Sequence, residues 1–268
     1  MMQLILHVAA VILYGLSGLL YWRELPKTGP RNWRPAAAFG AAAVILQGVL
    51  LASDLDRNGQ LVLGIGIILS LDAWAVAAIF LVASLSKPLA NLGAFIMPTA
   101  ALASIAEIFL PLEPEPVPAS DPWLIVHVVI SILAYSLLAI AVVQSLMLWL
   151  QERRLRRKQP AHLMQALPPM ETMESLMFEM IRVGFILLTL TLISGFFFSD
   201  QLFGRPLSIS HHSILALVAW LVFAILLLGR WRFGWRGRNA VRWTVGGFVL
   251  LVFVYVGAQV LLKLAIIR

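Results

Sequence analysis

Imidazole side chains near the ends of apolar stretches are the residues of this sequence best suited to chemistry. The chain has five histidines and no cysteine, which leaves the histidines as the best candidate ligands for a soft metal. His7, His127, His211 and His212 each lie near one end of a long apolar run, whereas His162 stands in a polar stretch. Two imidazoles from facing helices can hold a haem iron between them, and imidazole also binds Zn or Cu. The histidines are therefore candidate metal or haem ligands.

Two carboxylates inside apolar runs form a second candidate set. Asp72 lies in the middle of its run, within LSLDAW, and Glu107 lies nearer the end of the next run. An ionised group within a membrane costs several kcal/mol unless it faces a partner or a wet cavity. Such acids suit a proton or cation path, but we favour the interpretation of a single protonated or hydrogen-bonded acid that fixes helix packing.

Eight apolar runs, each long enough to cross a bilayer as a helix of about 20 residues, must position these groups. With 61% hydrophobic and 12% charged residues, the chain has too little polar surface for a soluble protein. We predict an all-α, polytopic membrane helix bundle that forms a single integral membrane domain over residues 1–268. The first run lacks a basic leader and a small-residue cleavage site, so we expect a retained span. The predicted spans are 3–22, 35–53, 61–85, 88–110, 123–150, 176–199, 209–229 and 241–264, with a cytoplasmic loop at 151–175.

Basic residues gather in alternate loops, which predicts how the chain is oriented. Arginine and lysine follow spans one, three, five and seven, whereas the loops after spans two and four are acidic. Positive loops face the cytoplasm, so both termini are predicted outside, in the cell inner (cytoplasmic) membrane. The net charge of +7 is explained by these loops, and no nucleic-acid partner is expected. Most tryptophans fall at the predicted membrane boundaries, with Trp74 and Trp220 as exceptions inside spans.

With this orientation, the four histidines of the spans share one depth near the outer leaflet. Ser131 and Tyr135 follow His127 on the same helical face, and this stripe suits a cofactor as well as ordinary hydrogen bonding between helices. Histidines at helix ends can also simply contact water in the headgroup region. His211 and His212 diverge by about 100° around their helix, so geometry alone does not choose between them. In the loop, Met173 and Leu176 belong to an amphipathic piece that we expect on the inner leaflet.

The second half of the sequence resembles a known family. The segments that carry the resemblance are HVVISILAYSLLAIAVVQSLMLWLQERRL, LPPMETMESLMFEMIRVGFILLTLTLISG, HHSILALVAWLVFAILLLGRWRFGWRGRNAVRW and GGFVLLVFVYVGAQVLL. They are similar to the cytochrome c assembly family, membrane haem-handling proteins of the CcsA and CcmC type, and within it to the short eight-span branch of HemX- and YpjD-like proteins. The first four spans resemble the family only in their layout.

The resemblance implies a haem cofactor and a set of ligands. The family's first outer histidine corresponds to His127, and the histidine eight positions before the Ala-Trp pair corresponds to His211. The short branch often has a membrane-embedded histidine at the place of Gln47. Two departures concern cytochrome c synthesis itself: the sequence has no tryptophan-rich WWD segment, and it lacks a histidine near its last outer segment.

These observations predict a non-enzymatic, haem-binding membrane protein engaged in haem handling or cytochrome c-type biogenesis. His127 and His211 would be the axial ligands, with His212 or His7 as substitutes or as groups that support a ligand. The expected partners are the lipid bilayer, haem, and other membrane or haem-pathway proteins. One alternative is an ion or small-solute permease, or an accessory subunit of one, that uses Asp72 and Glu107. Another is a membrane scaffold or regulator of haem synthesis that acts through the 151–175 loop.

Overall fold

Eight helices make up most of the described part of the chain, as the apolar runs predict. The structure is a computed structural model that describes residues 2–27, 31–57, 60–63, 65–109, 115–118, 122–156, 167–203 and 211–253. Within these ranges, seven helices are long and apolar enough to cross a membrane, and the predicted polytopic helix bundle is confirmed. The inside-outside orientation stays a prediction. The helices are α1 (Met2–Glu24), α2 (Arg34–Leu55), α3 (Ile65–Ser84), α4 (Gly93–Phe109), α5 (Pro122–Arg156), α6 (Met170–Phe203), α7 (His211–Phe233) and α8 (Gly237–Val252), with a short 3-10 turn η1 (Ala90–Leu92) before α4.

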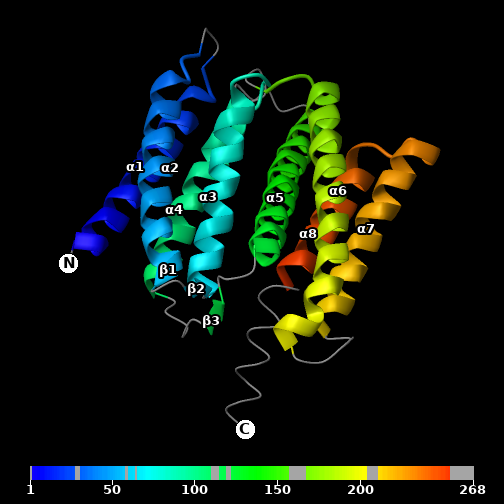
Figure 1. Cartoon of the computed structure of the whole chain (residues 1–268). Helices are drawn as coiled ribbons and strands as arrows, with labels where there is room; N and C mark the ends of the chain where they lie inside the picture. Colours follow the sequence, from blue (N-terminus) through cyan, green and yellow to red (C-terminus); the bar gives the residue numbers. More distant parts are fainter. Residues whose placement is uncertain are drawn as a thin grey trace. The chain divides into compact units, whose positions relative to one another are not determined.

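The chain divides into two compact units, each with its own set of helices. Unit 1 comprises Met1–Ser120 and Arg153–Met170, and unit 2 comprises Asp121–Glu152 and Glu171–Arg268. Unit 1 therefore holds α1 to α4, whereas unit 2 holds α6 to α8 and most of α5 (Figure 1). Each unit forms its own core, and the single membrane domain expected from the sequence stays a prediction.

In unit 1, α1 packs closely against α4 because small residues face bulky ones. A Cβ added at Gly18 would lie 2.7 Å from the Pro98 ring, and one added at Gly93 would lie 2.5 Å from the Tyr21 ring. These pairs run in opposite directions along the two helices, so α1 and α4 are antiparallel. Only glycine allows helices to approach so closely. Pro98 lies inside α4, where its missing N–H is tolerated because neighbouring helices cover the backbone.

A small antiparallel sheet joins two loops of unit 1, which the sequence analysis did not foresee. Its strands are β1 (Asp56–Arg57), β2 (Gln60–Leu63) and β3 (Glu115–Pro118), in the order β1-β2-β3. Gln60 pairs with Pro118, and Leu63 pairs with Glu115. The prolines of β3 are compatible with a strand because β3 lies at the edge of the sheet. The loop between α2 and α3 is therefore bonded to the loop between α4 and α5.

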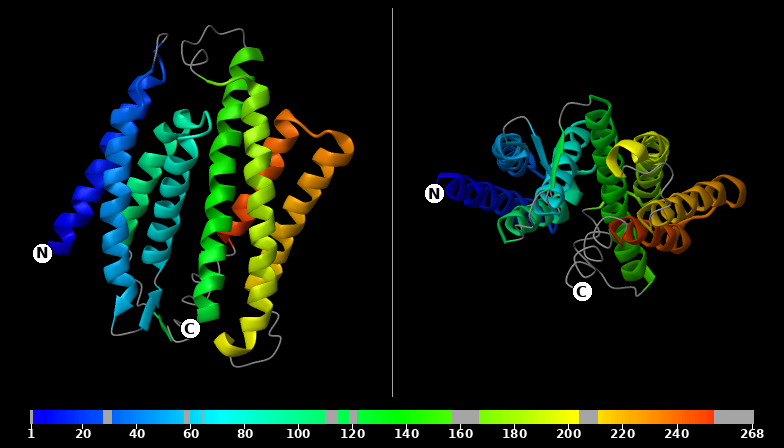
Figure 2. Two further views of the ribbon diagram at one scale, coloured as in Figure 1. Left: turned by 45° about the horizontal axis from the view of Figure 1, so that its top comes forward. Right: turned by 60° about the horizontal axis from the view of Figure 1, so that its bottom comes forward.

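In unit 2, α5 and α6 lie side by side and antiparallel over most of their length (Figures 1 and 2). A Cβ added at Gly184 of α6 would lie 2.9 Å from Leu138 of α5. Toward the other end, the Gln144 side-chain amide of α5 donates to the backbone carbonyl of Met173 over 3.1 Å. Phe223 of α7 likewise packs against Gly247 of α8. Close helix packing therefore holds the four helices of unit 2 together.

The start of α6 differs from what we expected for the end of the 151–175 loop. Residues 170–176, which we expected to lie on the membrane surface as part of an amphipathic piece, form the first turns of α6. Met173 is fully buried and Leu176 is 9% exposed, so neighbouring helices cover these side chains in place of lipid headgroups. Residues 157–166, with His162, lie outside the described residues. The described turn between α7 and α8 contains Gly234 (φ 63°) and Gly237 (φ 55°), whose left-handed backbone favours glycine.

Candidate functional site: histidines held by neighbouring helices

His127 lies near the start of α5 and is oriented by α6. Its ring atom Nδ1 is 2.6 Å from the Ser194 hydroxyl oxygen, and that hydroxyl donates to the backbone carbonyl of Thr191 over 3.1 Å. The single Ser194 proton can be directed either to the Thr191 carbonyl or to Nδ1. When it is directed to Thr191, Nδ1 donates to Ser194 and the neutral His127 ring has its lone pair on Nε2. A hydrogen bond on one ring nitrogen that fixes the tautomer of the other is the usual support of a ligating histidine.

The His127 ring packs against α6 beside Gly195. A Cβ added at Gly195 would lie 3.4 Å from Cε1 of His127, at the short end of ordinary van der Waals contact. Ser131, one turn along α5, donates to the backbone carbonyl of His127 over 2.7 Å. The predicted stripe of His127, Ser131 and Tyr135 is therefore present on one helix, although the described Ser131 hydrogen bond is to backbone. Its role in cofactor binding stays a prediction.

The start of α7 lies at the same end of unit 2 as His127. The Trp220 indole N–H of α7 donates to the Thr189 hydroxyl of α6 over 2.9 Å, which fixes the register of the two helices. At 1.5 Å per residue, Ser194 is about 7 Å beyond Thr189, and His211 is about 13 Å from Trp220. The backbone of His211 thus lies about one turn farther toward that end than Ser194. The side chains of His211 and His212 lie outside the described residues.

His7 belongs to unit 1, where it is paired with Glu107. Its Nδ1 donates to the Gln3 carbonyl over 2.9 Å, and its Nε2 is 3.8 Å from a Glu107 carboxylate oxygen. Both side chains are almost fully buried, at 11% and 7% exposed. The sequence predicts His7 as a substitute haem ligand and Glu107 as an acid of a permease. The structure shows that these two residues are neighbours.

Gln47 joins all four helices of unit 1. Its amide oxygen accepts from the Tyr14 hydroxyl of α1 over 2.5 Å. Its amide nitrogen donates to the Ser70 hydroxyl of α3 over 2.7 Å and to the Ser104 hydroxyl of α4 over 2.9 Å. Gln47 is 1% exposed. The position at which the family resemblance suggests a histidine is thus occupied by an amide whose polar atoms are all bonded.

Asp72 and Glu107 lie on opposite sides of this Gln47 layer. Asp72 follows Ser70 along α3 toward the predicted inner side, and Glu107 follows Ser104 along α4 toward the predicted outer side. The rise per residue places the two acids about 7 Å apart in depth. The Asp72 Oδ1 atom is buried and has no hydrogen-bond partner among the described residues. Their joint use in a permease stays a prediction.

Glu174, which the sequence did not single out, connects three segments at the predicted inner end of unit 2. Its carboxylate accepts from Arg230 of α7 over 2.5 Å and from Arg236 of the following turn over 3.1 Å. The Arg230 guanidinium also lies over the Phe178 ring, 4.7 Å from its centre. Two of the sequence segments that carry the family resemblance, METMES and GWRG, therefore contact each other. In the sequence, Glu174 lies at the polar start of an apolar run, and nothing in that position indicates its pairing with the arginines.

The tryptophans inside spans also have partners on neighbouring helices. The Trp74 indole N–H of α3 donates to the Val44 carbonyl of α2 over 2.8 Å, as Trp220 does to Thr189. Trp220 also stacks on Phe185, with ring centres 5.3 Å apart. A buried indole needs an acceptor, so the exceptions noted in the sequence are helix-packing residues. Within the described ranges, no three His, Asp or Glu side chains converge as a metal site would require.

Comparisons with known proteins agree with the resemblance seen in the sequence. A family model described as "Cytochrome C assembly protein" matches residues 38–266. The inner membrane protein YpjD of Escherichia coli strain K12 is 31% identical over 265 residues, which are 95% of this chain and 97% of that protein. The cytochrome c biogenesis protein CcsA of Prochlorococcus marinus strain MIT 9303 is 38% identical over 91 residues, 34% of this chain and 29% of that protein. No solved structure matches significantly.

The family match covers most of the chain, and the similarity to YpjD extends over nearly all of both proteins. Together with the membrane-spanning helices, this similarity assigns the chain to the inner membrane as a multi-pass protein, which confirms the predicted localisation. The chain belongs to the cytochrome c assembly protein family.

Proposed function

We propose that the protein handles haem during cytochrome c biogenesis and that His127 is an axial ligand of that haem. The observation that carries the proposal is the hydrogen bond from Nδ1 of His127 to Ser194. With Nδ1 as the donor to Ser194, the lone pair of the neutral imidazole is on Nε2, where it can bind iron. Family membership supports the assignment, and the name of CcsA places that relative in cytochrome c biogenesis.

The residues around His127 fit a porphyrin better than a small metal ion. A single imidazole oriented by a hydrogen bond can serve as an axial haem ligand, whereas zinc needs three or four protein ligands. Bound haem would supply a redox-active iron held in a hydrophobic plane. The role of this chain would be to bind haem and to orient it, so we infer a carrier and not an enzyme.

His211 is our proposed second ligand, with His212 as its substitute. Both begin α7 at the same end of unit 2 as His127. The His211 backbone lies about one helical turn beyond the level of Ser194 along the helix direction. His7 is the weaker candidate because its Nε2 is directed at Glu107, which suits a buried ion pair.

A spectroscopic titration tests the axial pair. Purified protein should take up haemin and give the reduced-minus-oxidised spectrum of a six-coordinate haem. We expect His127→Ala and His211→Ala each to change this spectrum and the double variant to abolish it, because each removes one ligand. His162→Ala is the matched control, since the sequence places His162 in the cytoplasmic loop. A protein that takes up no haemin, or an unchanged spectrum in the double variant, would contradict the proposal.

Ser194 should tune the affinity for haem without binding it. We expect Ser194→Ala to weaken haem binding about 10-fold to 100-fold, the usual effect of removing the partner that orients a ligand. The spectrum at saturation should keep its six-coordinate form. Thr191→Val is the control, because the Thr191 hydroxyl donates only to the Leu187 carbonyl of its own helix. Equal loss of affinity in both variants would show that α6 packing, and not the His127 hydrogen bond, is responsible.

A second candidate function is solute or ion transport through unit 1. It is supported by the buried Asp72 oxygen that lacks a hydrogen-bond partner in the described part of the chain, since such acids often lie on ion pathways. A flux that is lost in Asp72→Asn, in a protein that takes up no haemin, would favour transport over haem handling.

A further inference from the structure

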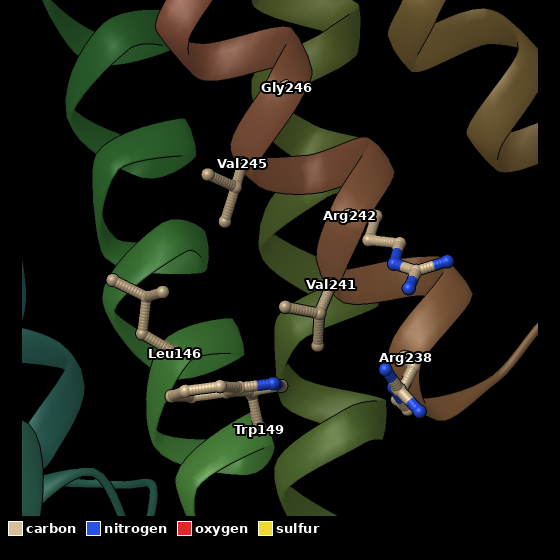
Figure 3. Close-up of a pocket in the computed structure, with 7 residues that line it drawn as sticks. All are labelled: Leu146, Trp149, Arg238, Val241, Arg242, Val245 and Gly246. Atoms are coloured by element: carbon tan, nitrogen blue, oxygen red, sulfur yellow. The ribbon is translucent and has the colours of Figure 1, made fainter.

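A groove of about 500 Å³ lies between α5 and α8 on unit 2. Figure 3 shows Leu146 and Trp149 of α5 on one side, with Val241 and Val245 of α8 pointing toward them. Arg238 and Arg242 line the same groove from the first turns of α8, and their guanidinium groups turn away from α5. The groove thus has aliphatic walls and two positive charges at its margin.

The arginines of this region fall into two classes. Arg230 and Arg236 both bind the buried Glu174 carboxylate. In contrast, Arg238 and Arg242 have no ion pair with any residue in the described ranges, and both are exposed. Glu152 lies near the first residue of α8, where a Cβ added at Gly237 would be 3.6 Å from its carboxylate. The two arginines outnumber this acid, so the margin of the groove favours an anion.

We propose that this groove binds one acidic phospholipid of the inner leaflet. The positive charges of α8 lie at the predicted cytoplasmic end, where anionic headgroups are found, and arginines between membrane helices bind such headgroups. An acyl chain would lie along Leu146, Val241 and Val245. Trp149 marks the boundary at which indole rings meet headgroups. The chemistry of this site is independent of the proposed haem site.

Gly246 leaves open space in the apolar part of the groove. It lines the groove, and a Cβ added there would meet nothing within 4 Å. A larger side chain at this position would therefore occupy the place of the acyl chain without disturbing the helix packing. Gly247, its neighbour, differs because an added Cβ would lie 2.9 Å from Phe223.

Native mass spectrometry of the full-length protein with defined lipids tests the proposal. We expect one phosphatidylglycerol to bind more tightly than phosphatidylethanolamine. The contribution of each arginine to binding an anionic lipid corresponds to about fivefold in affinity. Arg238→Gln with Arg242→Gln should therefore weaken phosphatidylglycerol binding about 25-fold and remove the preference. Arg232→Gln is the matched control, since Arg232 is an exposed arginine of α7 outside the groove lining.

Gly246→Leu should weaken the binding of both lipids, about tenfold or more, because about 0.8 kcal/mol is lost for each methylene displaced. The arginine variants keep the test valid if Gly246→Leu folds poorly. Unchanged phosphatidylglycerol binding in the double arginine variant would overturn the proposal, and so would an equal loss in Arg232→Gln. Displacement of the lipid by soluble glycerol phosphate at similar concentration would assign the site to a free phosphate.

Discussion

The two units differ in how their buried polar groups are connected. In unit 1, one amide, Gln47, bonds to side chains from three other helices. In unit 2, the polar contacts described above form two separate groups: His127 with Ser194 at one end, and Glu174 with two arginines at the other. Each group joins neighbouring segments at one end of the unit.

This difference suggests that the two units have different roles, one in stability and one in ligand binding. We call Gln47 a hub because its amide bonds to side chains of three other helices. Since its donors and acceptors are all bonded within the protein, it stabilises one arrangement of helices. No atom of the Gln47 amide is then available to bind a ligand. A pairwise contact such as that of His127 instead uses one ring nitrogen to position the other. We therefore expect substitutions in unit 1 to act on stability and those at the outer end of unit 2 to act on ligand binding.

The largest effect on stability should come from Glu174→Ala. Removing one member of a buried ion pair costs about 3–5 kcal/mol, and partial exposure of the arginines reduces this to about 3 kcal/mol. The free energy of unfolding, measured by denaturant titration in mixed micelles, checks this value. Glu171→Gln is the control, because Glu171 is 84% exposed and 3.6 Å from Arg236, and it should cost less than about 0.5 kcal/mol. Equal effects would show that the inner contact is screened by solvent.

Two glutamines give a direct contrast between the units. Gln47→Leu should cost about 2 kcal/mol, because it removes three interhelical hydrogen bonds of about 0.6 kcal/mol each and leaves the Tyr14 hydroxyl without its acceptor. Gln144 of α5 is as deeply buried, but its Oε1 has no hydrogen-bond partner among the described residues. Gln144→Leu also removes that unsatisfied carbonyl, so the same titration should give a change near zero. A larger loss for Gln144→Leu would refute the distinction between hub and pairwise contacts.

The smallest effect should come from Thr189→Val, which removes the acceptor of the Trp220 indole. A single interhelical hydrogen bond in a membrane protein contributes about 0.6 kcal/mol on average, and valine keeps the shape of threonine. Thr191→Val, which breaks only a bond within α6, should be neutral in the same measurement. If Thr189→Val also lowered haem affinity, the α6–α7 register would be part of the ligand site.

The sequence predicted the helices well because apolar length and loop charge act along the chain. Depth along a helix follows from residue number, and so the presence of His127 and the start of α7 at the same end of unit 2 could be anticipated. The rotation of each helix could not. The pairing of His7 with Glu107, and of Gln47 with Tyr14, Ser70 and Ser104, depends on which faces meet, and a membrane chain rich in apolar residues on every side gives little indication of that. Glu174 was missed for the same reason.

The three-stranded sheet of unit 1 also constrains how often the chain crosses the membrane. Two segments can form backbone hydrogen bonds only when both are on one side of the bilayer, since an extended chain cannot pair across the hydrocarbon core. Because β2 pairs with β3, the intervening α3 and α4 must together make an even number of crossings. The backbone pairing of the two loops thus agrees with the distribution of arginine and lysine, which predicts both loops on one side of the membrane.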